Sequence, residues 1–127
     1  MKRLLFFVLL LTFLNGCASQ PLNTDTGKPG QIKVVVFYDD NKNGVMDAGE
    51  SGAQSRVAIS QELSCPPAGD PNWVDTDPSG IHVFQDLKPG KYCVFPLGAV
   101  SYTTKMTQEA YVSSDQVATV AFGMERP

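Results

Sequence analysis

Short runs of apolar residues, separated by turn signals, dominate the chain after its first thirty residues. The runs are rich in β-branched and aromatic residues, and no window combines apolar residues at helical spacing with helix caps. Turn signals such as Asp77-Pro78-Ser79-Gly80 and Lys88-Pro89-Gly90 separate them. The pattern predicts strands over residues 32–38, 56–63, 81–84, 91–95, 103–112 and 116–122.

Strands this short and this closely spaced are typical of two antiparallel sheets packed face to face. We therefore expect an all-β domain, a seven-stranded two-sheet β-sandwich, over residues 32–127. A domain of this size buries only about 60–65% of its unfolded surface, so additional covalent or ionic stabilisation would help it.

The N-terminal residues have a different pattern. Lys2 and Arg3 precede an apolar run, Leu4 to Leu14. As a helix this run would be about 16 Å long, roughly half the thickness of a hydrocarbon core, which predicts a signal peptide rather than a membrane span.

The residues that follow the apolar run, Leu14-Asn15-Gly16-Cys17, resemble the lipobox of bacterial lipoproteins. The resemblance implies that residues 1–16 are a signal peptide, that Cys17 is acylated, and that Cys17 anchors the exported protein in a membrane of the cell envelope. The residue after the cysteine is Ala18 and not Asp, which resembles the pattern of outer-membrane lipoproteins if the cell is Gram-negative. The alternative is an ordinary secretory signal with a chance cysteine. Residues 18–31 are rich in Pro, Gly, Thr and Asn, so residues 17–31 are expected to be a lipidated cysteine and a flexible tether.

Charge narrows the choice of partners. The sequence of 127 residues has 10 Lys and Arg against 13 Asp and Glu, a net charge of -3. Removal of the signal peptide would leave 8 basic side chains against the same 13 acidic ones. No basic stripe is available to displace counterions from phosphates, which argues against nucleic acid as the partner.

The loop after the first predicted strand matches the twelve-residue calcium pattern D-x-[DN]-x-[DN]-G-x5-E at every constrained position. Alternate side chains in such a loop supply oxygens, and Gly44 permits the sharp turn between them. About seven oxygens in all suit Ca²⁺ better than Mg²⁺. A strand precedes this loop, so the ion is expected to stiffen it rather than to act as a switch; the alternative is a solvated turn without metal. The expected ligands are Asp39, Asn41, Asn43, Val45 through its carbonyl, Asp47 and Glu50.

Three segments together resemble the SdrD B-like domains of bacterial surface proteins: Val34 to Val57, Asp77 to Val94, and Val117 to Gly123. The resemblance implies a Cna-B or prealbumin-like sandwich, and calcium as a stiffening ion at the loop described above. Related domains carry a Lys–Asn crosslink. Lys33 lies in the first strand here, but the last strand has no Asn, so no such bond is expected.

Two cysteines remain once Cys17 is set aside. Cys65 and Cys93 form an even pair in an exported protein, which predicts a disulfide. A metal site built on these two cysteines is the alternative, and His82 is the only further nitrogen ligand available to it. A second calcium site at Asp75 and Asp77 is also conceivable, although an Asp-Pro turn in a hairpin explains these residues better.

No motif places a Ser or Cys nucleophile beside a base, so no enzyme is expected. We expect His82 to fill a core-facing position in a strand. The sequence favours an envelope lipoprotein that displays one calcium-binding sandwich with a structural or adhesive role, through an envelope protein or glycan partner. The alternative is a carbohydrate- or ligand-binding accessory module, in which Trp73, Tyr102 and Tyr111 would form the platform.

Overall fold

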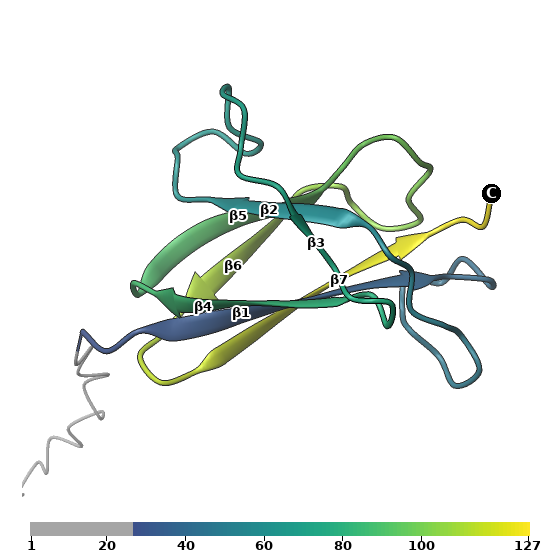
Figure 1. Ribbon diagram of the computed structural model, residues 1–127, viewed down its shortest axis with the longest axis horizontal. Helices are drawn as coiled ribbons and strands as arrows, with labels where there is room; N and C mark the ends of the chain where they lie inside the picture. Colours follow the sequence, from purple (N-terminus) through teal and green to yellow (C-terminus); the bar gives the residue numbers. More distant parts are fainter. Residues whose placement is uncertain (1–26) are drawn as a thin grey trace, which may run out of the picture.

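A computed structural model describes residues 27–127. The predicted signal peptide, Cys17 and most of the predicted tether lie outside the described residues. Within the described part, no helix is long and apolar enough to cross a membrane. Seven strands form two sheets (Figure 1): β1 (Gly30–Tyr38), β2 (Arg56–Ser60), β3 (Val74–Asp75), β4 (Ile81–Leu87), β5 (Gly90–Pro96), β6 (Gln108–Val112) and β7 (Val117–Met124).

The two sheets pack face to face, and Figure 1 shows β2 and β5 over β1 and β4. One sheet has the order β4-β1-β7, and the other has the order β3-β2-β5-β6. β1 runs antiparallel to β4 and parallel to β7, while every pair in the second sheet is antiparallel. Because β1 and β7 are parallel, both end at the same end of the sandwich, where the predicted calcium loop begins.

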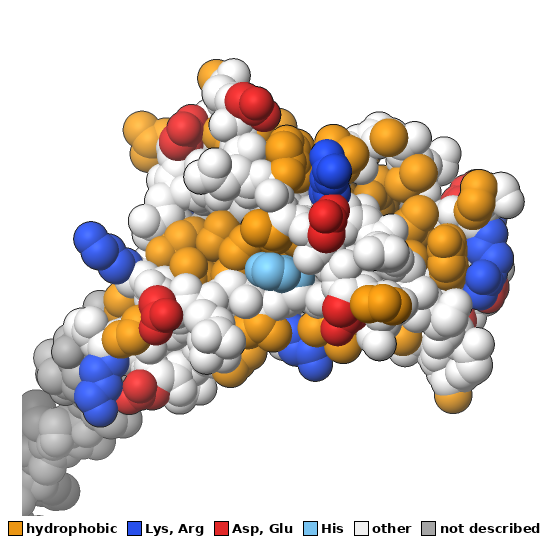
Figure 2. All heavy atoms as spheres, in the orientation of Figure 1, with side chains coloured by type: hydrophobic (Ala, Val, Ile, Leu, Met, Phe, Trp, Pro, Cys, Tyr) orange, Lys and Arg blue, Asp and Glu red, His pale blue; other side chains and the backbone are white. Residues whose placement is uncertain are grey.

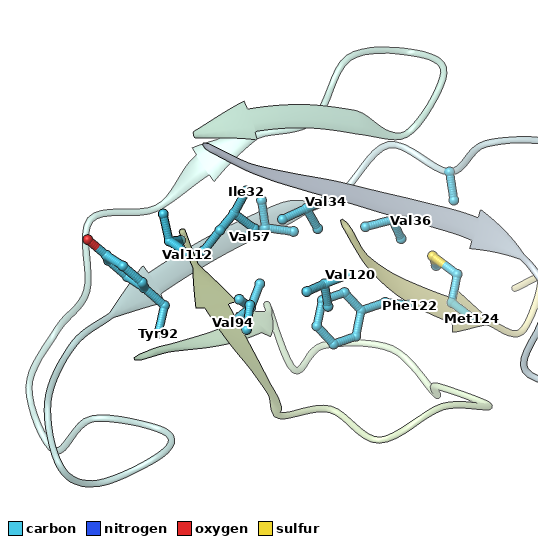
Figure 3. Packing of buried hydrophobic residues seen from close by; sticks show 12 residues of the cluster. Ile32, Val34, Val36, Val57, Tyr92, Val94, Val112, Val120, Phe122 and Met124 are labelled. Carbon is cyan, nitrogen blue, oxygen red and sulfur yellow. The ribbon is translucent and has the colours of Figure 1, made fainter. Parts of the chain in front are cut away.

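The core lies between the sheets (Figure 3). In β1 the side chains of Ile32, Val34 and Val36 are fully buried, whereas the residues between them are only partly covered. Side chains of a strand alternate between its two faces, so every second residue of this apolar run faces the core. Complete burial of one such side chain stabilises the fold by about 1.5–3 kcal/mol. Figure 3 shows them facing side chains from β2, β5 and β7, including Val57, Val94, Val120 and Phe122.

The predicted fold class is confirmed, and several strand assignments need correction. β2 ends at Ser60 rather than at residue 63, and β4 extends to Leu87 rather than ending at residue 84. β6 begins at Gln108 rather than at residue 103, because the segment before it bonds to β7 instead, with the N–H of Thr103 donating to the carbonyl of Gly123 (2.8 Å). β3 was not predicted, because its two residues are defined by pairing with β2 and not by any local apolar pattern.

A second, smaller apolar cluster covers the outer face of the second sheet. Ala58, Cys93 and Phe95 are buried there, and Trp73 packs edge-on against Phe95 with ring centroids 5.6 Å apart. Cys93 is bonded to Cys65, with 5.5 Å between their Cα atoms, so the predicted disulfide is confirmed. The disulfide links the connection between β2 and β3 covalently to β5.

His82 lies on β4 directly opposite Val34, whose side chain faces the core. Residues paired across antiparallel strands point to the same side of a sheet, so His82 occupies the expected core-facing position. Its ring packs edge-on against Phe84, with centroids 4.6 Å apart. Figure 2 shows the histidine at the surface, with apolar side chains beside it.

Candidate functional site

The loop after β1 begins with a buried carboxylate. Asp39 is only 2% exposed, and its N–H donates to the carbonyl of Met124 at the end of β7 (3.0 Å). Its Oδ1 accepts the N–H of Asn43 (3.1 Å), and its Oδ2 accepts the N–H of Gly44 (2.8 Å) and the hydroxyl of Thr103 (2.5 Å). The first expected ligand is therefore held by the loop itself and by a distant segment.

Two opposing effects act on the pKa of Asp39. Burial raises the pKa, while the Thr103 hydroxyl and nearby main-chain N–H groups lower it by stabilising the charged form. The net result is a pKa below the usual value of 3.8. The carboxylate of Asp39 is therefore ionised in the folded protein at neutral pH.

Three further expected ligands meet in the middle of the loop. Oδ2 of Asp47 accepts N–H groups from the side chains of Asn41 (2.7 Å) and Asn43 (2.6 Å). Oδ1 of Asn41 accepts the N–H of Asn43 (3.0 Å), and Oδ1 of Asn43 accepts the N–H of Val45 (2.8 Å). Each amide oxygen therefore has one donor and retains a second lone pair.

Glu50 closes the loop on itself. Its Oε1 accepts the N–H of Asp40 (2.9 Å) and its Oε2 accepts the N–H of Asp47 (2.8 Å). The turn between these ends relies on Gly44, whose φ of 77° is in the left-handed region. Val45, expected to contribute only its carbonyl, leaves its side chain 60% exposed.

The basic side chains at this loop pair with residues other than the expected ligands. Lys42 pairs with Glu125 (2.9 Å) and Arg126 pairs with Asp40 (2.7 Å). Arg126 also lies over the ring of Tyr38, 4.4 Å from its centre. None of the salt bridges found in residues 27–127 involves the three carboxylates expected to bind the ion, which are Asp39, Asp47 and Glu50.

The side chains of the loop offer oxygen ligands, the kind that hard cations bind. Carboxylate, amide and main-chain oxygens are the ligands that Ca²⁺ prefers, and none of the three carboxylates forms a salt bridge among the described residues. Residues 27–127 contain no group of three or more His, Cys, Asp or Glu placed to hold a metal. The expected set accordingly depends on Asn oxygens and the Val45 carbonyl. A cation would also compete with two amide N–H groups for Asp47.

Asp75 and Asp77 serve other contacts. Asp75 pairs with Arg56 (3.1 Å), across the short β2–β3 pairing. Asp77 accepts the N–H of Ile81 on Oδ1 (2.9 Å) and the N–H of Gly80 on its carbonyl (2.9 Å), which closes the turn before β4. These contacts support the interpretation as a structural turn.

The three aromatic residues of the alternative carbohydrate platform are used differently. Trp73 covers the outer cluster on the second sheet. Tyr102 packs edge-on against Phe122 and its hydroxyl donates to the carbonyl of Leu97 (3.1 Å). Tyr111 on β6 is 69% exposed. Because Trp73 and Tyr102 pack into two separate clusters, the three rings do not form one surface.

Two contacts of the loop were not found from the sequence. Thr103 lies 64 residues from Asp39, and Arg126 lies 86 residues from Asp40. Neither belongs to the twelve-residue pattern, and no local signal marks them. Only the parallel pairing of β1 with β7, together with the segment that follows β5, brings them to the loop.

Acid is expected to destabilise the metal-free domain partly through Asp39. The unfolded carboxyl takes up a proton near pH 3.8, and the folded one does so only at lower pH, so its contribution is complete above pH 3.8 and is lost as pH falls through the folded pKa. Urea midpoints measured from pH 5 to pH 2 should fall less steeply for Asp39→Asn than for the wild type. An equal slope in the two proteins would contradict this assignment.

Comparisons with known proteins concern the sandwich as a whole. The family model of the SdrD B-like domain matches residues 30–123. No curated protein shows significant similarity to the sequence. Among solved structures, the Bacillus anthracis TIE protein is similar with a TM-score of 0.56 and 17% identity, over 78% of this chain and 17% of that one.

Two pilins are similar as well. GBS52, a minor pilin of Streptococcus agalactiae, has a TM-score of 0.54 and 13% identity, over 79% of this chain and 45% of that one. BcpA, the major pilin subunit of Bacillus cereus, has a TM-score of 0.51 and 12% identity, over 79% and 31% respectively. The chain thus matches less than half the length of each of these three structures, and at such identities the likeness concerns the fold.

Proposed function

Because this chain belongs to the SdrD B-like domain family, we propose that it is a structural or adhesive module of the bacterial cell envelope. The observation that carries the proposal is the family match over nearly the whole sandwich. Two of the structures that share its fold are pilins by name, which supports the same role. Modules of this family and fold are typically not enzymes.

The proposed module is displayed by a lipid anchor on Cys17, with a short tether before the sandwich. The lipobox resemblance of Leu14 to Cys17 supports this part of the proposal. Acyl chains contribute about 0.8 kcal/mol of membrane affinity per buried methylene, and more than one chain makes anchoring stable. The partner would be an envelope protein or a glycan.

Calcium would stiffen the loop of residues 39–50 in this proposal. The ion would be held by the oxygens of Asp39, Asn41, Asn43, Asp47 and Glu50 and by the carbonyl of Val45, and it would replace internal hydrogen bonds by stronger ionic contacts. Since the loop is also bonded to β7, a stiffer loop would brace that end of the sandwich.

We expect calcium to raise the unfolding temperature of metal-stripped protein by several degrees or more. Binding at 100 times the Kd stabilises the folded state by about 2.7 kcal/mol, and each kcal/mol is worth about 4–8 °C in a domain of this size. Thermal unfolding followed by circular dichroism, with and without millimolar Ca²⁺ or Mg²⁺, measures the effect. Mg²⁺ should have a smaller effect than Ca²⁺.

Variants locate the calcium effect on the loop. Asp39→Ala and Glu50→Ala should abolish the stabilisation by calcium, whereas Asp70→Ala, in the exposed connection before β3, should keep it. If all three variants respond to calcium as the wild type does, the assignment to residues 39–50 is wrong. If the wild type does not respond at all, the loop is a solvated turn.

A further inference from the structure

The hydroxyl of Thr103 reaches the buried carboxylate of Asp39 from outside the calcium pattern. Thr103 Oγ1 donates to Oδ2 of Asp39 at 2.5 Å, and the N–H of Gly44 donates to the same oxygen at 2.8 Å. Oδ1 of Asp39 accepts the N–H of Asn43 (3.1 Å). The two donors at Oδ2 fill that oxygen, because a carboxylate oxygen accepts about two hydrogen bonds.

Thr103 is held in place by β7 and not by the loop. Its N–H donates to the carbonyl of Gly123 (2.8 Å), and the neighbouring Tyr102 forms a β-bridge with Met124. The hydroxyl of Thr104 in turn accepts the N–H of Gly123 (3.2 Å). These contacts hold the backbone around Thr103 against β7 rather than against the loop.

The absence of a side chain at Gly123 makes this contact possible. A Cβ placed on Gly123 would lie 2.4 Å from Thr103 Oγ1 and 3.0 Å from both Cβ and Oδ2 of Asp39. These distances are shorter than ordinary van der Waals contacts. The Asp39 carboxylate and the Thr103 hydroxyl therefore both lie against β7 at Gly123.

We propose that Thr103 is a positioning residue for metal binding: it holds Oδ2 of Asp39 so that Oδ1 faces the other ligands of residues 39–50. The inference rests on the proposed calcium site and adds a residue that the loop pattern does not contain. Since the hydroxyl orients the ligand before the ion arrives, the folded protein loses less conformational freedom on binding.

The test is calorimetric titration of metal-stripped protein with Ca²⁺ at 25 °C, for the wild type, Thr103→Val and Thr103→Ser. The valine keeps the size of the side chain and removes the donor, so the Kd should rise about tenfold or more, in the range typical of lost outer contacts to metal ligands. Serine keeps the hydroxyl and should bind within about threefold of the wild type. Thr119→Val, at an exposed position of β7, is the matched control and should not change the Kd.

Thermal unfolding of the metal-free variants separates positioning from a purely structural role. A Kd for Thr103→Val equal to that of the wild type, whatever its metal-free unfolding temperature, overturns the role of Thr103 and leaves the calcium site standing. A wild type without calcium binding overturns both. If Thr103→Val does not fold, Thr103→Ala takes its place with the same expected loss of affinity.

Discussion

Gly80→Ala is expected to destabilise the domain by about 4 kcal/mol or more, which is exceptional for the addition of one methyl group. The φ of Gly80 is 76°, which already disfavours any side chain. A Cβ there would also lie 2.0 Å from the carbonyl oxygen of Val36 and 2.8 Å from the nitrogen of Ala53. Both atoms belong to one hydrogen bond, from Ala53 N–H to Val36 O (2.9 Å), so neither can move without breaking it.

Gly49→Ala separates the conformational cost from the steric one. Gly49 has a φ of 95°, but nothing lies within 4 Å of the position its Cβ would take. Its substitution should cost about 1–2 kcal/mol, the penalty of a left-handed residue alone. Urea unfolding followed by circular dichroism gives both free energies. Equal losses in the two variants would show that the packing around Gly80 does not limit the substitution.

Removing the disulfide in the double variant Cys65→Ala, Cys93→Ala is expected to cost about 3.5 kcal/mol. The bond joins residues separated by 28 positions, and without it the unfolded chain gains the freedom of that loop. Removal of the disulfide should also disturb the folded state, because Cys93 lies in the outer cluster that Trp73 covers. The chain has one tryptophan, so its fluorescence reports on this cluster alone.

Circular dichroism and Trp73 fluorescence should be followed together during urea unfolding. We expect the midpoint by both probes to fall in the double variant, and the fluorescence of the folded variant to shift toward that of an exposed indole. Reductant should lower the midpoint of the wild type and leave the variant unchanged. A wild type whose midpoint is the same with and without reductant would mean that the bond does not stabilise this fold.

Strand prediction succeeded where the signal was local. The run of β1 is long, β-branched and bounded by a turn-forming loop, and its assignment needed no knowledge of its partners. The prediction extended β6 to residue 103 because the intervening residues also suit a strand. Thr103 and Thr104 bond to β7 instead, and no pattern within the segment distinguishes pairing with β5 from contact with β7.

The candidate site shows the same division. The twelve-residue spacing predicted the ligands from Asp39 to Glu50, and in the structure the side chains of Asn41 and Asn43 donate hydrogen bonds to Asp47. The spacing says nothing of Thr103, whose contact with Asp39 depends on β7 lying beside β1. It likewise could not show that Lys42 and Arg126 pair with Glu125 and Asp40, outside the expected ligand set.

Features that depend on neighbours along the chain were accessible from residue order: the all-β class, the turn at Gly44, the oxygen-rich loop and the cysteine pair. Features that depend on residues distant in the chain could be seen only in the tertiary structure. They are the two-residue β3, the closeness of Gly80 to β1, and the hydrogen bond from Thr103 to Asp39. The physical reason is that backbone preference and side-chain spacing act over a few residues. Close packing, in contrast, is set by which strands the core brings together.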